Sequence, residues 1–495
     1  MKAKRKVLLV IFFTLVVLPC FQSCEDLLER KPYDGLIKND FWQSEEDVRA
    51  ALMGCYDQLQ ECLENYLSWG EVRGDMLVVE RGNELKEFNT QIISQYNNLC
   101  NWKAFYVLIN RVNTVIENGP GAMEKDGNFT EEELDGMLAE CYYLRSLAYF
   151  YLVRTFKEVP LITASYATDD QEYYYPKNTT SEIYTQILGD LNTAEEMAKA
   201  TYDNEMEDHG RATKWAIMAL KADLLLWMGM EDPSYYEQSL EEASKIIESG
   251  VFDMEPGINW FNLYFPGNSM ESIFEIQYNA AFLEFNPLVD WFSTEGGAPT
   301  YSVMLNPETN TVTFWTENLT TEDGIRGKNR SFAKVSGDNI VWKYSGTGPS
   351  ITRLRSASFS DGNWIIYRLA EMHLIKAEAL NELGRTGESV AELNLIRERA
   401  ELPPVDASIS SENLALEILE ERKRELAFEG KRWYDLVRYS LNYGPEYMIN
   451  RILKMWKDVE ISQRITNPES WFLPIYYEEL RINKSLKQNP YYDFQ

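Results

Sequence analysis

The chain has 495 residues, and its 78 Asp and Glu against 48 Lys and Arg give a formal net charge of -30. A strongly acidic surface argues against nucleic acid and anionic lipid as partners. The length offers ample material for a core, and a helical-repeat protein of this size can form one continuous body.

The first thirty residues predict export. Four basic residues precede an apolar run from residue 7 to residue 18, which is too short to span a bilayer and is typical of a signal peptide over residues 1–23. Ser23 followed by Cys24 resembles a bacterial lipoprotein cleavage site, so Cys24 is the expected lipidated first residue, carrying palmitate. Glu25 and Asp26 resemble the acidic signal for the outer cell face. An ordinary signal peptide cut near the same place is the alternative.

Cysteine and histidine usage offers no metal or nucleophile site. Cys55, Cys62, Cys100 and Cys141 all fall in apolar helical patterns, where buried free thiols are expected. Only two histidines occur, and neither CxxC spacing nor a glycine-rich phosphate loop is present. The sequence therefore predicts no metal and no cofactor.

Helical periodicity predicts a mainly α body built from helix pairs. The expected pairs are residues 45–61 with 95–118, 131–155 with 181–199, 212–229 with 234–249, and two helices within 364–400. The last pair breaks at Gly384 and Gly387 and spans about the 34 residues of a tetratricopeptide repeat. We expect about four tetratricopeptide-like pairs forming a short solenoid.

Residues 251–363 lack helical periodicity and are rich in Gly, Pro, Asn, Thr and aromatic residues. One short alternating strand is predicted at residues 272–278, which gives minor β content. Long irregular segments held by a rigid scaffold commonly bind ligands. The expected organisation is a single body over 24–495, with N-terminal helix pairs to 250, a ligand-loop region over 251–363, and a C-terminal pair, charged helix and tail over 364–495.

Four segments spread over nearly the whole chain carry a resemblance to a known family. They are Cys24 to Tyr56, Glu140 to Ile162, Tyr367 to Gly384, and Glu421 to Arg438 with Leu473-Pro474-Ile475 and Gln488-Asn489-Pro490 behind it. This order resembles the SusD/RagB family of outer-membrane nutrient-uptake lipoproteins. The resemblance implies a SusD-like helical body, a ligand site built on loops, a SusC-like TonB-dependent transporter as partner, and no enzymatic activity.

The charged run from Glu421 to Arg438 has two interpretations. Glutamates repeat every four residues, and residues three or four apart share a helix face, so ion pairs such as Glu421 with Arg424 are expected. Perturbed carboxylates also occur in active sites, but no spacing here singles out a catalytic pair. A structural network is the favoured interpretation.

Exposed aromatic rings in the irregular region are the first candidates for ligand binding. Trp291, Tyr301, Phe314 and Trp315 lie among Gly, Pro, Thr and Asn residues, and a flat sugar face stacks well on such rings. Packing of the loop on itself is the alternative for each of them.

A second candidate loop runs from residue 75 to residue 95. It contains Arg81, Asn83 and Glu84 beside Phe88 and Asn89, and amide and guanidinium groups next to an aromatic ring suit hydroxyl-rich ligands. In the resembled family this loop borders the ligand site, which favours Phe88 and Asn89.

These observations together predict a cell-surface lipoprotein, anchored in the outer membrane, that binds oligosaccharides or polysaccharides and delivers them to a transporter. The first alternative keeps this role with peptide ligands. The second is a periplasmic tetratricopeptide scaffold that binds a protein partner through its concave face.

Overall fold

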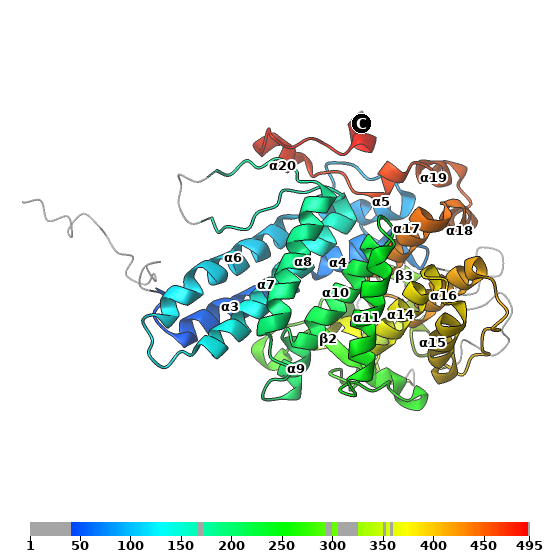
Figure 1. Cartoon of the computed structure of the whole chain (residues 1–495). Coiled ribbons are helices and arrows are strands. Elements are labelled where there is room, and N and C mark those ends of the chain that lie inside the picture. The colour runs from blue at the N-terminus through cyan, green and yellow to red at the C-terminus, as the bar shows by residue number, and fades with distance from the viewer. Residues whose placement is uncertain are drawn as a thin grey trace, which may run out of the picture.

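The computed structural model describes residues 41–166, 172–293, 299–304, 325–349, 353–356 and 360–493. Helices dominate these residues, and three short two-stranded sheets are set among them (Figure 1). The expected mainly α class with minor β is confirmed. Within the described residues, none of the helices is both long enough and apolar enough to cross a bilayer.

Four antiparallel helix pairs form the body, and they are the four that periodicity predicts. Their helices pack directly on one another. The pairs are α3 (Glu45–Gln60) with α6 (Lys103–Met123), α7 (Glu131–Phe156) with α8 (Thr180–Met197), α10 (Lys214–Met228) with α11 (Ser234–Glu248), and α14 (Leu369–Glu382) with α15 (Thr386–Arg399).

Three of these helices begin at capping boxes. Ser44, Thr130 and Thr179 each accept a hydrogen bond from the third backbone N–H of their helix, and the acidic side chain at that third position bonds back to the cap. Such reciprocal bonds satisfy donors that a helix start otherwise leaves unpaired. The chain therefore specifies where α3, α7 and α8 start.

The central helix α7 is buried along most of its length, and its charges are paired inside the protein. Arg145 forms a two-point pair with Asp190 of α8 at 2.7 and 2.8 Å, and Arg154 lies 3.2 Å from Asp223 of α10. Paired guanidinium groups can be buried without leaving a bare charge. Cys55, Cys62, Cys100 and Cys141 are buried free thiols, as expected.

Two predicted helix starts are wrong. The helix predicted from residue 95 begins only at Lys103, because residues 98–100 form a separate 3-10 turn. Residues 364–368 form strand β6 (Trp364–Arg368) rather than the first turn of a helix, and α14 begins at Leu369. β6 pairs antiparallel with β2 (Ser272–Ile276), the strand that alternation does predict. Both strands are buried throughout, and the bulky Trp-Ile-Ile-Tyr run favours a strand in such surroundings.

The ligand-loop region contains more regular structure than its composition suggests. A hairpin joins β4 to β5, and several short helices precede and follow it. These elements are η5 (Gly257–Leu263), η6 (Ala280–Phe282), α12 (Leu288–Phe292), β3 (Tyr301–Val303), β4 (Phe332–Val335), β5 (Asp338–Val341) and α13 (Trp342–Ser345).

The C-terminal part packs back onto the body. The backbone N–H of Leu473 donates to the carbonyl of Thr155 at the end of α7 over 2.8 Å, and Asn489 donates to the carbonyl of Phe156. The elements there are α16 (Ser411–Glu425), α17 (Arg432–Tyr443), α18 (Glu446–Trp456), α19 (Val459–Arg464), η8 (Pro468–Trp471), α20 (Tyr477–Ile482) and η9 (Pro490–Tyr492).

The remaining elements lie between the first two long helices and between α8 and α10. They are α4 (Leu63–Leu67), the π-helical turn η3 (Ser68–Val72), β1 (Leu77–Val79), α5 (Asn83–Thr90), η4 (Asn98–Cys100) and α9 (Glu205–Gly210). β1 and α5 place the second candidate loop at the surface beside α17 and the C-terminal helices (Figure 1).

Candidate functional site

The two candidate loops meet in a small sheet. β1 pairs antiparallel with β3, with Val79 opposite Tyr301, so segments more than 200 residues apart in the chain lie side by side. The pairing extends at both ends, because Glu80 donates to the carbonyl of Thr300 and Met304 donates to that of Met76, both at 2.9 Å. The residues after β1 and those before β3 therefore border one surface region.

Trp291 and Tyr301 lie together at this junction. Their ring centroids are 6.4 Å apart at 78°, and the N–H of Thr300 donates to the carbonyl of Trp291 over 2.8 Å. Tyr301 is 1% exposed, and burial, followed by the nearby Glu64 carboxylate, raises the pKa of its hydroxyl. Trp291 is half-buried. Trp291 thus keeps an accessible edge, while Tyr301 supports it from inside.

Phe88 and Asn89 lie on the inner face of α5 and do not face solvent. Phe88 is fully buried in the core. The Asn89 amide donates to the carbonyl of Val72 at 2.7 Å and to that of Leu77 at 3.2 Å, and it accepts from the N–H of Val79 at 2.7 Å. A buried amide with three backbone partners fixes the path of the chain around it.

The exposed rim of the loop is polar. Residues 80–84, which include Glu80, Arg81, Asn83 and Glu84, are all exposed. Gly82 allows the turn into α5, since its φ of 97° lies in the region that L side chains rarely adopt. The sequence predicts that these rim residues lie in a loop with Phe88 and Asn89. Because a loop has no regular inner face, that prediction does not separate the exposed residues from the two buried ones.

Buried polar contacts clamp the base of the loop. Arg73 and Gln91 exchange hydrogen bonds across it, and Arg73 also donates to the carbonyls of Ser470 and Trp471. The Asp75 carboxylate forms an ion pair with Arg432, with 2.7 Å between Asp75 Oδ1 and Arg432 Nε. Burial by itself raises the pKa of Asp75, but the Arg432 and Arg451 charges outweigh it and hold that pKa well below its usual range. These contacts fix the base of the loop against the C-terminal part of the chain.

Family comparisons identify the protein class. Residues 230–492, more than half of the chain, match the family model described as SusD family, and residues 26–226 match one described as starch-binding associating with outer membrane. The chain belongs to the SusD family.

Individual SusD relatives support this assignment. SusD-like protein P38 of Formosa agariphila is 28% identical, over 99% of this chain and 100% of the relative. The starch-binding protein SusD of Bacteroides thetaiotaomicron is 23% identical over 75% of each chain. A crystal structure of a SusD superfamily protein from the same species has a TM-score of 0.74 at 23% identity, covering 91% of this chain and 99% of that one, and it shows the shared fold. SusD-like proteins are binding proteins.

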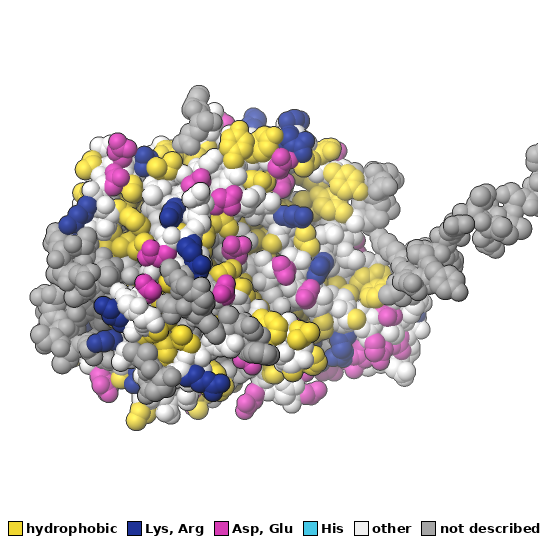
Figure 2. Space-filling model, turned by 180° about the vertical axis from the view of Figure 1, so that it is seen from behind, with side chains coloured by type: hydrophobic (Ala, Val, Ile, Leu, Met, Phe, Trp, Pro, Cys, Tyr) yellow, Lys and Arg dark blue, Asp and Glu magenta, His cyan; other side chains and the backbone are white. Residues whose placement is uncertain are grey.

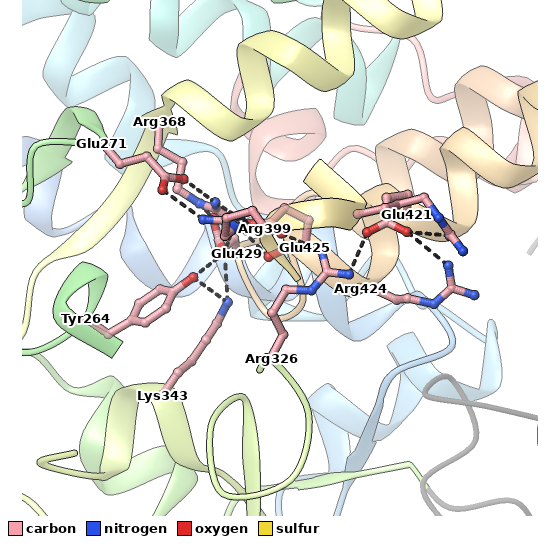
Figure 3. A network of polar contacts seen from close by, with 11 residues as sticks. Tyr264, Glu271, Arg326, Lys343, Arg368, Arg399, Glu421, Arg424, Glu425 and Glu429 are labelled. Atoms are coloured by element: carbon pink, nitrogen blue, oxygen red, sulfur yellow. Dashed lines mark hydrogen bonds and ion pairs between the residues drawn. The ribbon is translucent and has the colours of Figure 1, made fainter. Parts of the chain in front are cut away.

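In this SusD-family chain the charged run of α16 forms a buried network (Figure 3). Arg368 lies 2.8 Å from Glu271 and 3.1 Å from Glu429, and it also pairs with Glu425. All four side chains are at most 2% exposed. Burial alone would raise the pKa of Glu425, but the surrounding guanidinium groups outweigh it and hold that pKa well below its ordinary value. The expected Glu421–Arg424 pair is present at 3.2 Å.

This network connects residues 251–363 to the helical body. Arg326 reaches Glu421 and Glu425 of α16, and Lys343 of α13 lies 2.8 Å from Glu429 (Figure 3). Separating these segments would leave buried charges without partners, which is costly. The geometry supports the structural interpretation of the charged run.

Some predicted residues fall outside the described part of the chain. They are Cys24, Glu25, Asp26, Phe314 and Trp315, so their predicted roles rest on the sequence alone. Among the described residues, no group of three or more His, Cys, Asp or Glu side chains is arranged to hold a metal ion.

Proposed function

We propose that this SusD-family protein binds an oligosaccharide at the β1–β3 junction and delivers it to a SusC-like TonB-dependent transporter in the outer membrane. The pairing of β1 with β3 carries the proposal, because it brings the half-buried Trp291 beside the exposed polar rim of residues 80–84. An aromatic ring next to amide, guanidinium and carboxylate groups suits a ligand with apolar faces and many hydroxyls.

Each predicted site residue takes a specific role in this proposal. Trp291 provides the stacking surface, and Trp315 provides a second one. Tyr301 supports Trp291 from the interior, whereas Phe88 and Asn89 hold the rim in place through packing and backbone hydrogen bonds. Binding at a surface held this rigidly loses little conformational freedom.

The proposed location follows from the N-terminus and the family. Cys24 carries the lipid, and the protein is tethered to the outer membrane with its loops at the cell surface. The family description of the N-terminal half, which links relatives to starch and to the outer membrane, supports this placement. Replacing Cys24 with Ala is expected to abolish palmitate labelling and to release the protein from the membrane fraction.

Calorimetric titration against panels of oligosaccharides and peptides tests the ligand class. We expect binding of at least one glycan, with Trp291→Ala weakening it by tenfold or more. Leu441→Ala, which removes an exposed apolar side chain on α17, outside the β1–β3 junction, is the control and should bind normally. Peptide binding without glycan binding would overturn the proposal in favour of peptide uptake.

A further inference from the structure

A hollow with five tyrosines in its lining lies at the start of α6, next to α20. Its volume is about 510 Å³. It shares no residue with the β1–β3 junction. We call it the tyrosine groove; the residues used below are Trp102, Lys103, Tyr106, Asn110, Tyr166, Tyr173, Tyr174, Tyr175, Glu479 and Asn483.

Aromatic rings of the tyrosine groove pack on one another, and two of them are exposed. Tyr166 and Tyr173 stack with centroids 5.0 Å apart and planes at 19°, and Tyr106 lies edge-on to Trp102 at 5.6 Å. Tyr173 is 43% exposed and Tyr174 is 51% exposed. Seen from behind, hydrophobic side chains gather along the upper edge of the molecule, where Figure 1 places α20 (Figure 2). Large aromatic residues exposed together commonly mark a binding surface.

Hydrogen bonds tie the three walls of the groove together. Asn483, just after α20, donates to the carbonyl of Tyr175 over 2.8 Å. Tyr106 of α6 donates to the carbonyl of Pro160, and Asn110 of α6 accepts from the N–H of Tyr166, both at 2.7 Å. Since helix, loop and tail are bonded to one another, the groove exists before any ligand arrives.

The chemistry of the lining selects a neutral, hydroxyl-rich ligand. Lys103 and Glu479 are the charged residues of the lining and have opposite signs, so the groove has no excess charge for an ionic ligand. Burial, followed by the neighbouring Tyr175 and Tyr173, raises the pKa of Tyr166 to about 12. A tyrosine hydroxyl is protonated at neutral pH even without this shift, so it can donate as well as accept.

We propose that the tyrosine groove is a second oligosaccharide-binding site, which holds a neutral glycan by stacking on tyrosine rings and by hydrogen bonds to phenol and amide groups. This inference rests on the proposed glycan-binding function. It adds that one chain holds two glycan segments at the same time, so a long polysaccharide gains apparent affinity from two linked contacts.

Titration stoichiometry tests the second site on the mature protein. The probes are maltoheptaose and hexasaccharides of xylan, arabinan, laminarin and mannan. We expect two oligosaccharides per chain for the wild type and one for Tyr173→Ala/Tyr174→Ala. Tyr174→Ala alone leaves the stacked Tyr166–Tyr173 pair in place and should weaken the second event at least fivefold. An unchanged thermal unfolding midpoint shows that the variants are folded, and Leu441→Ala is the control.

The Trp291→Ala variant separates this inference from the proposed function. One bound glycan in the wild type, lost in Trp291→Ala and retained in the tyrosine variants, would overturn the second site and leave the proposed function standing. One glycan lost only in the tyrosine variants would support the groove and overturn the β1–β3 junction as the ligand site. Binding of peptides and of none of the glycans would overturn both.

Discussion

Gly70 lies directly against Gly430, although 360 positions separate them. A Cβ built on Gly70 would lie 1.9 Å from the carbonyl oxygen of Gly430 and 2.6 Å from its carbonyl carbon. Next to this contact, the Glu71 carboxylate accepts the backbone N–H groups of Phe428 and Gly430 at 3.0 and 3.1 Å. The π-helical turn η3, which precedes the second candidate loop, and the turn after α16 are thus joined by backbone packing.

Replacing Gly70 with Ala should destabilise the protein strongly, because backbone on both sides leaves no flexible group to move away. Overpacking of a buried site typically costs ~1–3 kcal/mol, and we expect the upper end or more. Gly54→Ala is the control. Gly54 lies in α3, no other segment comes within 4 Å of the added Cβ, and the change should raise the free energy of unfolding by ~0.5–1 kcal/mol. Urea unfolding of both variants measures the difference, and equal stabilities would contradict the close contact.

Glu71 should make stability depend on pH. Burial raises its pKa to about 8, although backbone hydrogen bonds and nearby cations oppose the shift. Between about pH 4.5 and pH 8 the folded protein keeps a proton that the unfolded chain releases, so raising the pH favours unfolding by up to ~1.4 kcal/mol per unit. Below about pH 4.5 both states hold the proton, and the effect disappears.

The Glu71→Gln variant isolates this contribution. Gln cannot ionise, and its cost in lost hydrogen bonding does not change with pH. The unfolding free energy of the wild type minus that of the variant should therefore fall steadily from pH 5 to pH 8. Glu388→Gln, at an exposed pair with Arg385, should give a flat difference over this range. A flat line for Glu71→Gln as well would mean that Glu71 is ionised throughout.

The helix pairs could be predicted because their information is local. The stripe of small and aliphatic residues through α14 repeats every three or four positions, and capping residues such as Ser44 and Thr130 mark helix starts. Periodicity does not identify β6, because its apolar residues continue into the stripe of α14 and extend the predicted helix backwards. Residues 364–368 form a strand because they pair with β2, and this long-range contact has no signal in the local sequence.

The candidate site could be predicted only as far as its segments. Composition singles out the loop around Arg81 and the region of Trp291 and Tyr301, and the β1–β3 pairing does bring them together. Which side chains face outward depends on α5, where only Leu85 and Phe88 share an apolar face, too few residues to predict a helix from periodicity. The tyrosine groove could not be found from sequence, because its walls come from three distant segments.

Removing Arg368 should disrupt the buried network. Arg368→Met keeps much of the side-chain volume but leaves Glu271, Glu425 and Glu429 short of a positive partner. Breaking a buried ion pair from one side costs ~3–5 kcal/mol, because an uncompensated charge stays inside. Arg385→Met breaks an exposed pair with Glu388 and should leave the unfolding midpoint unchanged. Equal midpoints for the two variants would show that the network contributes no net stability.

Asn89 distinguishes a supporting residue from a ligand contact. Asn89→Ala removes three hydrogen bonds to Val72, Leu77 and Val79 and leaves their backbone groups buried, which should cost ~1–3 kcal/mol for each group left unpaired. Glycan affinity should fall along with stability, because the rim of residues 80–84 loses its support. Thr90→Ala, next in sequence, removes only a hydroxyl bonded within α5 and serves as the control.

Urea unfolding and calorimetric titration on the same samples measure the stability and the glycan affinity of the Asn89 and Thr90 variants. If Asn89→Ala weakens glycan binding while stability stays at the wild-type value, then the Asn89 side chain contacts the ligand directly, as the sequence predicts for this loop.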